Sequence, residues 1–370
     1  MQKNYSNYPV ETTFGAFGDS EVLAKALRKA SGTEEPRVLI VADMNVVQRT
    51  TGLGAQIGRY VQQNGIRLAG EPVVVAAGEK IKADSLRTML HIAASLLEAK
   101  LGKEDVVLAL GGGTLLDVAG YAAAQIRGGV KIVRVPTTPA AMLDAAFAEY
   151  AAVNSSTVKD ALRVPSRPAA VVIDPTFAAT VLDGVWNGGI SEAIRLALAS
   201  DSSFMKKIVE LVPAYRERDI EALETIVDEA FAVRRKRGAT TLGEWSAIRL
   251  EAMSGYKLPH GYAMAIGTCI DAAYSVEMGH MKESIRDDMF DLLVACGSLD
   301  GLRHSRHLLG QAESLVRGLD AWRLATGSEA VVVPTGLGKS TEESEPSRDA
   351  YKDAFADILE MSSDSSPAEE

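Results

Sequence analysis

Residues 106–125 read VVLALGGGTLLDVAGYAAAQ and join two apolar runs through three consecutive glycines. The first run, residues 106–110, is unbroken, which is typical of a strand buried on both faces. The second run, from residue 114, places its apolar residues at the spacing of one helix face. A strand, a glycine turn and a helix in this order predict one unit of a parallel α/β sheet.

Further units of this kind lie on both sides of the glycine turn. The apolar runs at 37–43 (RVLIVAD), 71–79 (EPVVVAAGE) and 130–138 (VKIVRVPTT) predict strands, and segments 46–65 and 85–100 have helical spacing. Strands that alternate with helices predict a parallel sheet with helices on both faces. We therefore predict an α/β nucleotide-binding domain over residues 1–174.

The pattern changes after residue 175. One clear strand, EAVVVPTG at 329–336, remains among segments with helical spacing. The fold class is thus predicted as α/β, with the parallel-sheet domain followed by an all-helical domain over residues 175–358. Residues 359–370 are mostly polar and small, so we predict a disordered tail.

The composition restricts the class of protein and its partners. With 370 residues, 47% of them hydrophobic, the chain has enough apolar material for a sizeable core. The formal net charge of −10 argues against nucleic acid or an anionic membrane as the main partner. Cys269 and Cys296 form no C-x-x-C pair, and residues 1–15 have no apolar signal core. We expect a protein of the cytoplasm.

The glycine turn is a candidate phosphate site. Glycines before a helix let the backbone approach a phosphate, and the free N–H groups of the helix start favour an anion. The spacing is not G-x-G-x-x-G, so the usual dinucleotide fingerprint is absent. A plain tight turn remains the alternative, and Asp117 near it could be a surface residue.

Residues 240–267 read TTLGEWSAIRLEAMSGYKLPHGYAMAIG and hold one of five histidines, His260. With Glu244 it offers an imidazole and a carboxylate, which can bind a divalent ion through N and O donors. Each residue has a plain alternative. His260 could be a loop histidine, and Glu244 a helix-start residue favoured by the helix dipole.

Five segments resemble a known family. They are GGGTLLDVAGYAA, RGGVKIVRVPTT, MLDAAFAEYAAVN, SEAIRLAL and LPHGYAMAIG, in this order along the chain. The set resembles the 3-dehydroquinate synthase-like sugar phosphate cyclases, in the superfamily that includes the iron-containing alcohol dehydrogenases. Residues 242–267 look closest to the EboD-type dehydroquinate synthase homologues. The resemblance covers residues 36–340.

The resemblance implies an N-terminal domain that binds NAD, a helical domain that binds a divalent metal, and a homodimer. Zinc is the metal the family implies, with manganese or iron as alternatives. The implied reaction oxidises a hydroxyl transiently, eliminates phosphate, reduces the ketone back, opens the ring and closes a carbocycle. The implied substrate is a small phosphorylated keto-sugar, and NAD ends each cycle unchanged.

The resemblance also assigns roles to single residues. The implied metal ligands are Glu192, Glu244 and His260, two carboxylates and one imidazole. Glu192 could instead be an ordinary helix glutamate. The implied substrate-side and catalytic residues are Asp144, Lys159, Arg127, Arg237 and Arg195. The implied NAD-binding residues are Asp43, Asn45, Glu79, Lys82, Gly111, Gly112, Gly113, Asp117, Thr137 and Thr138.

The sequence departs from the family mainly at substrate-side positions. Ile248 stands where the family has a histidine that handles protons, and isoleucine cannot transfer a proton. Tyr150 and Arg195 stand at lysine positions, and Tyr262 replaces a glutamate. True dehydroquinate synthase activity is therefore not expected. Three hypotheses remain: a cyclase-like lyase with another substrate, an NAD(P)- and metal-dependent alcohol or polyol dehydrogenase, and a non-catalytic NAD-binding homologue.

Overall fold

The computed structural model describes residues 8–76, 78, 81, 84–155 and 158–364. The chain forms two compact units that divide between Leu182 and Asp183. We call the part up to Leu182 the sheet unit and the part from Asp183 the helical unit. The division lies later than the predicted boundary at residue 174. The reason is that the 3-10 helix η2 (Pro175–Thr180) packs against α2 (Met44–Arg49) and α7 (Pro139–Leu143) of the sheet unit.

A seven-stranded sheet in which every pairing is parallel forms the centre of the sheet unit, as predicted. Its order is β1-β9-β6-β5-β2-β3, and β4 also pairs with β2. The strands β1, β3 and β9 were not predicted from the sequence, because they are only three, two and four residues long. The strands are β1 (Val10–Thr12), β2 (Arg37–Asp43), β3 (Arg67–Leu68), β4 (Val73–Val75), β5 (Val106–Gly111), β6 (Lys131–Pro136) and β9 (Ala170–Ile173).

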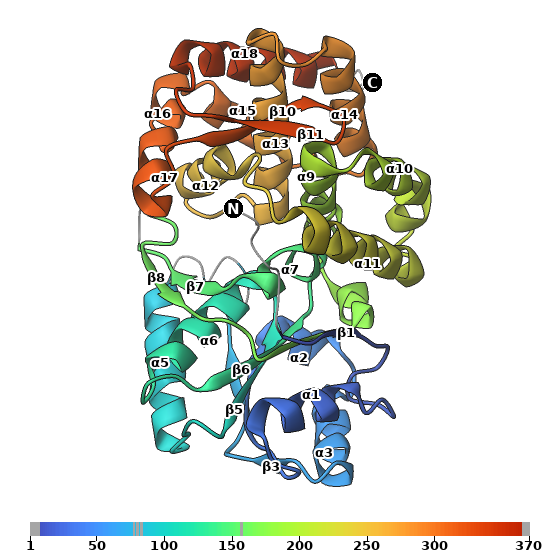
Figure 1. The fold of residues 1–370 in the computed structure, drawn as a ribbon, viewed down its shortest axis with the longest axis vertical. Helices are drawn as coiled ribbons and strands as arrows, with labels where there is room; N and C mark the ends of the chain where they lie inside the picture. Colours follow the sequence, from blue (N-terminus) through green and yellow to red (C-terminus); the bar gives the residue numbers. More distant parts are fainter. Residues whose placement is uncertain (1–7, 77, 79–80, 82–83, 156–157, 365–370) are drawn as a thin grey trace. The chain divides into compact units, whose positions relative to one another are not determined.

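Helices cover both faces of this sheet (Figure 1). On one face, α1 (Val22–Ser31) and α3 (Leu53–Gln63) share a buried cluster with alternate strand residues. On the other, α6 (Gly113–Gln125) packs on β5 and β6, and α5 (Ser85–Glu98) packs beside α6. The single helix predicted over 46–65 is two helices, α2 and α3. Gly52 separates them with a φ of 73°.

Three short elements complete the sheet unit. The 3-10 helix η1 (Ala145–Phe147) follows α7, and β7 (Tyr150–Val153) pairs with β8 (Leu162–Pro165) in an antiparallel hairpin. α6 packs against both β7 and β8. The residues after the glycine turn therefore touch the hairpin.

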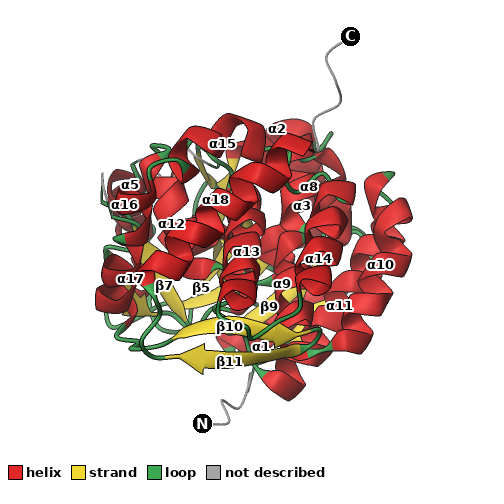
Figure 2. Cartoon of the chain, turned by 90° about the horizontal axis from the view of Figure 1, so that it is seen from above, coloured by secondary structure: helices red, strands yellow, loops and turns green. Residues whose placement is uncertain are grey.

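The helical unit is built around α13 (His260–Glu277), which is buried along most of its length. It contacts α8, α9, α12, α14 and α18, and Figure 2 shows it among α12, α14 and α18. The helices are α8 (Asp183–Gly189), α9 (Ser191–Ser200), α10 (Ser202–Arg216), α11 (Ile220–Arg237), α12 (Glu244–Met253), α13, α14 (Glu283–Ala295), α15 (Leu302–Leu309), α16 (Ala312–Val316), α17 (Gly318–Thr326) and α18 (Arg348–Asp364).

Two predictions for this unit need correction. It is not all-helical, since β10 (Val331–Gly336) pairs with β11 (Lys339–Glu343); the polar sequence of β11, KSTEE, gave no strand signal. The tail predicted to be disordered from residue 359 is helical as far as Asp364. Arg306 stabilises this helix end, because it donates to the carbonyl oxygens of Leu359 at 3.2 Å and Ser362 at 3.5 Å.

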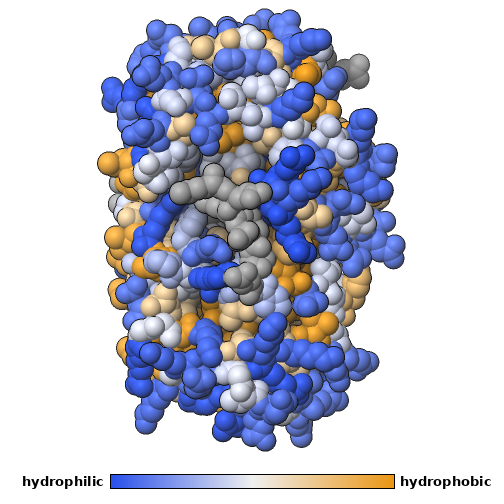
Figure 3. Space-filling view, viewed as in Figure 1, coloured by the Kyte–Doolittle hydropathy of each residue, from blue (hydrophilic) through white to orange (hydrophobic). Residues whose placement is uncertain are grey.

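The surface agrees with the charged composition. On the face drawn in Figure 3, hydrophilic residues cover most of the area and hydrophobic residues form smaller patches. Among the helices described, none combines the length and the apolar character needed to cross a membrane.

Candidate functional site

The ends of three neighbouring strands bring most of the predicted NAD residues together. β2, β5 and β6 are adjacent and parallel, so Asp43, the glycine turn and Thr137 lie at one edge of the sheet. A Cβ at Gly111 would lie 3.1 Å from Cβ of Asp43, and a Cβ at Gly112 would lie 3.2 Å from Cγ2 of Thr138. A side chain at either glycine would therefore be crowded by the residues at the neighbouring strand ends.

Some of the polar side chains at this edge of the sheet accept hydrogen bonds from backbone N–H groups. Asp43 accepts a hydrogen bond from the N–H of Asn45 at 2.7 Å, and burial raises its pKa. Thr138 caps α7 through a hydrogen bond from the N–H of Ala141 at 3.3 Å. Thr137 is fully buried, and its hydroxyl makes no hydrogen bond to any other residue that the structure describes. A buried hydroxyl without a partner is costly, so this edge fits a polar ligand such as NAD.

Asp117 faces the β7–β8 hairpin. Its pKa is raised to about 7: burial is the largest cause and the carboxylate of Asp160 adds to it, while Arg134 and Lys159 act in the opposite direction. The N–H of Ala152 on β7 also donates to it. Asp117 is thus a buried carboxyl near a predicted substrate lysine, and it can exchange a proton near neutral pH.

Arg134 is a buried cation that sequence reasoning missed. Its side chain is 1% exposed and donates to the carbonyl oxygens of Ala146 at 3.2 Å, Ala148 at 2.6 Å and Ser166 at 2.8 Å. These bonds fix η1, the turn that directly follows Asp144. The signal was available, since an arginine inside the apolar run KIVRVP must find buried partners.

The predicted cations are placed differently from one another. Lys159 lies in the hairpin connection near Asp117. Arg127 is exposed and follows the C-terminal end of α6, whereas the glycine turn lies at the N-terminal end. Because a helix of 13 residues is ~20 Å long, Arg127 lies far from the glycine turn of its own chain. Arg237 is the exposed last residue of α11. Glu79 and Lys82 lie outside the described residues.

In the helical unit, Glu192 and His260, two of the predicted metal ligands, lie in contact. Nε2 of His260 lies 3.2 Å from Oε1 of Glu192, and Nδ1 lies 2.6 Å from Oε1 of Glu251. Both carboxylates are buried, at 1% and 0% exposed, while the imidazole is 34% exposed. Nε2 of His260 and Oε1 of Glu192 are close enough for both to bind one ion at about 2.1 Å. A histidine that binds a metal through one ring nitrogen usually has a carboxylate or carbonyl group at the other, as Nδ1 of His260 has Glu251. The pair therefore fits two ligands of a divalent metal.

Arg195 is a partner of Glu192. Its Nε donates to Oε2 of Glu192 at 2.6 Å and its Nη1 donates to the carbonyl oxygen of Thr240 at 2.5 Å, with the side chain 4% exposed. Oε1 of Glu192 then faces His260. Arg195 thus fixes which carboxylate oxygen of Glu192 faces the imidazole. The family pattern, which has a lysine at this position, did not suggest this role.

Glu244 remains a predicted third ligand. It begins α12 and is half-buried. Across the described ranges, no group of three or more His, Cys, Asp or Glu side chains is close enough to hold a metal. Glu251, which sequence reasoning missed, contacts His260 instead. Glu251 lies two helical turns after Glu244, so the two side chains are on the same side of α12. This spacing could have identified Glu251 from the sequence.

Tyr262 and Tyr150, which depart from the family pattern, both contact neighbouring residues. Tyr262 packs against Gly184 and Gly301; a Cβ at Gly184 would lie 3.1 Å from its hydroxyl. Tyr150 is 38% exposed, and the guanidinium of Arg163 lies 4.6 Å above its ring.

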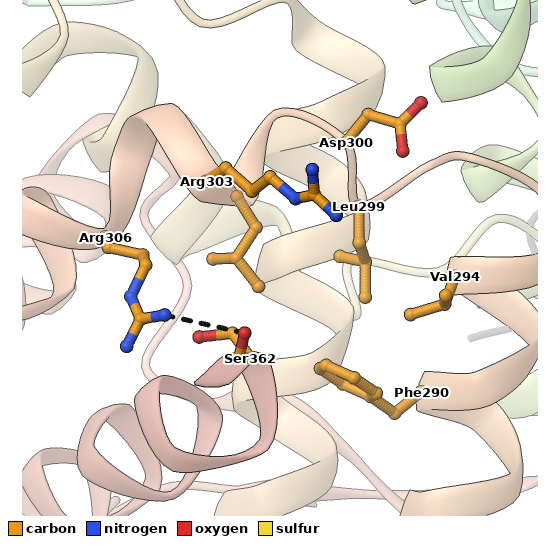
Figure 4. A pocket seen from close by; sticks show the side chains of 8 residues that line it. Phe290, Val294, Leu299, Asp300, Arg303, Arg306 and Ser362 are labelled. Carbon is orange, nitrogen blue, oxygen red and sulfur yellow. Dashed lines mark hydrogen bonds between the residues drawn. The ribbon is translucent and has the colours of Figure 1, made fainter. Parts of the chain in front are cut away.

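A separate pocket in the helical unit is formed by α14, α15 and the end of α18 (Figure 4). None of the predicted site residues lines it. Its lining residues are Phe290, Val294, Leu299, Asp300, Leu302, Arg303, Arg306 and Ser362.

Solved structures define the class of fold. The chain resembles ValA, the 2-epi-5-epi-valiolone synthase of Streptomyces hygroscopicus subsp. jinggangensis 5008 solved with NAD+ and Zn2+, with a TM-score of 0.78 and 20% identity over 98% of this chain and 99% of that one. It also resembles the NADH-dependent butanol dehydrogenase A of Thermotoga maritima, with a TM-score of 0.69 and 15% identity over 96% and 97%. The fold is that shared by sugar phosphate cyclases and alcohol dehydrogenases of this type.

Sequence comparison narrows this class to a family. The 3-dehydroquinate synthase N-terminal family matches residues 72–186, and its C-terminal counterpart matches residues 189–300. The 3-dehydroquinate synthase of Acidithiobacillus ferrooxidans is 30% identical over 79% of this chain and 80% of its own length. That of Pyrobaculum neutrophilum is 30% identical over 74% and 84%. The chain belongs to the 3-dehydroquinate synthase family, which confirms the resemblance at this level.

Proposed function

We propose that the protein is a sugar phosphate cyclase-like lyase that converts a phosphorylated keto-sugar to a carbocycle with release of phosphate, and that its substrate differs from that of dehydroquinate synthase. The observation that carries the proposal is His260, held between Glu192 and Glu251 in a chain of this family. Bound NAD supplies a reversible hydride acceptor, and a bound divalent metal supplies positive charge for a developing oxygen anion.

The chain's own residues have distinct tasks in this proposal. Nε2 of His260 and Oε1 of Glu192 hold the metal, with Glu244 as the proposed third ligand. The glycine turn, Asp43, Asn45 and Thr137 hold NAD. Lys159 and Arg237 hold the anionic groups of the substrate. Asp144, which directly precedes the turn η1 that Arg134 holds, contacts the reacting end.

The polar groups that are missing argue for a changed substrate. Ile248 removes one proton-transfer group, and Arg195, committed to Glu192 and Thr240, cannot release a proton. Asp117, in the sheet unit, has a pKa of about 7 and can hold or release a proton at neutral pH.

The products distinguish the three hypotheses. The metal-loaded protein with NAD is incubated with a panel of keto-sugar phosphates, and phosphate and NADH are measured together. We expect phosphate release without net NADH, and at least a hundredfold less release from Asp144→Ala, with thermal unfolding checking that the variant folds. Net NADH without phosphate would instead support a dehydrogenase. Neither product, with intact NAD binding, would support the non-catalytic homologue.

We also propose a homodimer, on the evidence of one face of α5. Leu86, Leu90 and Leu97 are 45%, 58% and 48% exposed, and with Ala93 they follow the i, i+4, i+7, i+11 spacing of a helix-pairing seam. When the two-fold axis of an isologous dimer is perpendicular to α5, the two copies of the helix run antiparallel. Arg87 at one end of the seam then approaches Glu98 of the other copy, whereas a parallel arrangement would bring like charges together.

The seam predicts the oligomeric state of a variant. Leu90→Lys is expected to convert the dimer to a monomer at micromolar concentration, because it places two ammonium groups near the two-fold axis. Sedimentation velocity measures the change. Leu324→Lys, at a leucine 89% exposed on α17, is the matched control and should stay dimeric. A dimer that survives Leu90→Lys would place the interface elsewhere.

A further inference from the structure

Asp271 on α13 is a buried carboxylate that the proposed reaction does not use. Its side chain is 0% exposed, and three donors converge on it. The N–H of Gly243 donates to Oδ2 at 2.6 Å, the indole N–H of Trp245 to Oδ1 at 3.1 Å, and the hydroxyl of Tyr351 to Oδ1 at 3.0 Å. Gly243 and Trp245 are the two neighbours of Glu244, so one side chain holds the start of α12 from both sides.

Glycines bring the same two elements into backbone contact. Gly243 has a φ of 75°, and a Cβ there would lie 2.7 Å from the backbone nitrogen of Thr268. A Cβ at Gly267 would overlap the carbonyl oxygen of Gly243 and lie 2.9 Å from Oγ of Ser246. The start of α12 therefore rests directly on the α13 backbone, without space to slide.

Aromatic packing closes the other side of Asp271. The ring of Tyr351 stacks on Tyr274 at 4.1 Å between centroids and meets Trp245 edge-on at 4.7 Å. These rings come from α18, α13 and α12, and they exclude water from the carboxylate. In such surroundings each hydrogen bond to the carboxylate is strong, and a donor that lost its acceptor would be left unsatisfied.

The two ends of α12 are thereby fixed against one helix. α12 and α13 run antiparallel, since Gly243 contacts Asp271 while Glu251 contacts His260. His260 and Asp271 are 11 residues apart, or about three turns, and lie on the same face of α13. A shift of α12 at Asp271 would be transmitted along the helix to Glu251 and to the orientation of His260.

We infer that Asp271 is a positioning residue that sets the register of α12 on α13 and so holds Glu251 and Glu244 in place for the metal site. The inference rests on the proposed metal role of His260 and Glu192. A carboxylate is required because all three groups facing it are donors. In Asp271→Asn one acceptor oxygen becomes an NH2 group, and a buried donor loses its partner.

The test measures metal binding and helix mobility separately. Full-length wild type, Asp271→Asn and the matched variant Tyr351→Phe are titrated with Zn2+ and with NAD by calorimetry. Tyr351→Phe removes one donor but leaves the hydrogen bonds of Gly243 and Trp245 to the carboxylate. We expect Asp271→Asn to weaken Zn2+ binding about 10–100-fold, Tyr351→Phe to weaken it less than threefold, and both to bind NAD as wild type does.

Amide hydrogen exchange gives a readout that does not need metal. In Asp271→Asn the amides of α12 should exchange at least tenfold faster, while those of α11 stay unchanged. If Asp271→Asn does not fold, Gly267→Ala tests the same contact and should show both effects. Equal Zn2+ affinity in wild type and Asp271→Asn, or equal losses in Asp271→Asn and Tyr351→Phe, would overturn the inference. Wild type without Zn2+ binding would refute the proposed function instead, and the exchange rates would still test the register.

Discussion

Replacing His260 with alanine is expected to abolish stoichiometric metal binding. The wild-type protein, purified without chelators, should retain one divalent ion per chain, because His260 and Glu192 present a nitrogen and an oxygen donor 3.2 Å apart. Glu192→Ala should have the same effect. Glu251→Gln should weaken affinity about 10–100-fold without abolishing it, since Glu251 orients the imidazole through Nδ1.

Elemental analysis by mass spectrometry measures these changes, and calorimetry gives the affinities. Glu277→Ala is the matched control, because Glu277 is an exposed carboxylate on the same helix. Glu244→Ala decides the third ligand: loss of metal equal to that of His260→Ala would place Glu244 on the ion. Full metal content in His260→Ala would show that the site lies elsewhere.

Gly261→Ala is expected to destabilise the helical unit strongly. α8 and α13 cross at Gly188 and Gly261, and an added Cβ would lie 2.7 Å from Cα of Gly188 and closer still to its carbonyl group. The hydroxyl of Ser191 also links the two helices, because it lies 2.7 Å from the carbonyl oxygen of Gly188 and 2.9 Å from that of Gly261. Because the obstacle is backbone, it cannot rotate away. We expect a loss of about 2–3 kcal/mol in the free energy of unfolding.

Denaturant unfolding measures that loss, and Gly58→Ala provides the control. Gly58 lies within α3, and a Cβ there would meet nothing within 4 Å. Alanine should therefore stabilise the protein by about 0.5–1 kcal/mol, since it lowers the entropy of the unfolded chain. Unchanged stability in Gly261→Ala would mean that the helices can separate at this crossing without cost.

The parts of the fold set by local sequence could be predicted. The central strands are continuous in Val, Ile and Leu, and the glycine turn marks the step from β5 to α6. Residues 359–364 could not be predicted as helical, because their order depends on Arg306, which lies more than fifty residues earlier.

Some features of the candidate site could likewise be predicted from the sequence, and others could not. Motifs identified Glu192 and His260 as predicted metal ligands, and the structure brings their side chains into contact. The edge at Asp43, Gly111 and Thr137 follows from parallel strands that end together. Arg195 and Asp271 were not predicted in their present roles. What each contacts is decided by helix packing, which brings Thr240 to one and Tyr351 to the other.

Burial of Asp117 and Asp271 couples folding to proton uptake. Each has a pKa raised from the ordinary 3.8 to about 7, by burial above all. Between these values the folded chain carries protons that the unfolded chain has lost. Folding in weakly acidic solution therefore takes up protons, and the stability from these two groups is full below about pH 4 and lost as pH rises through 7.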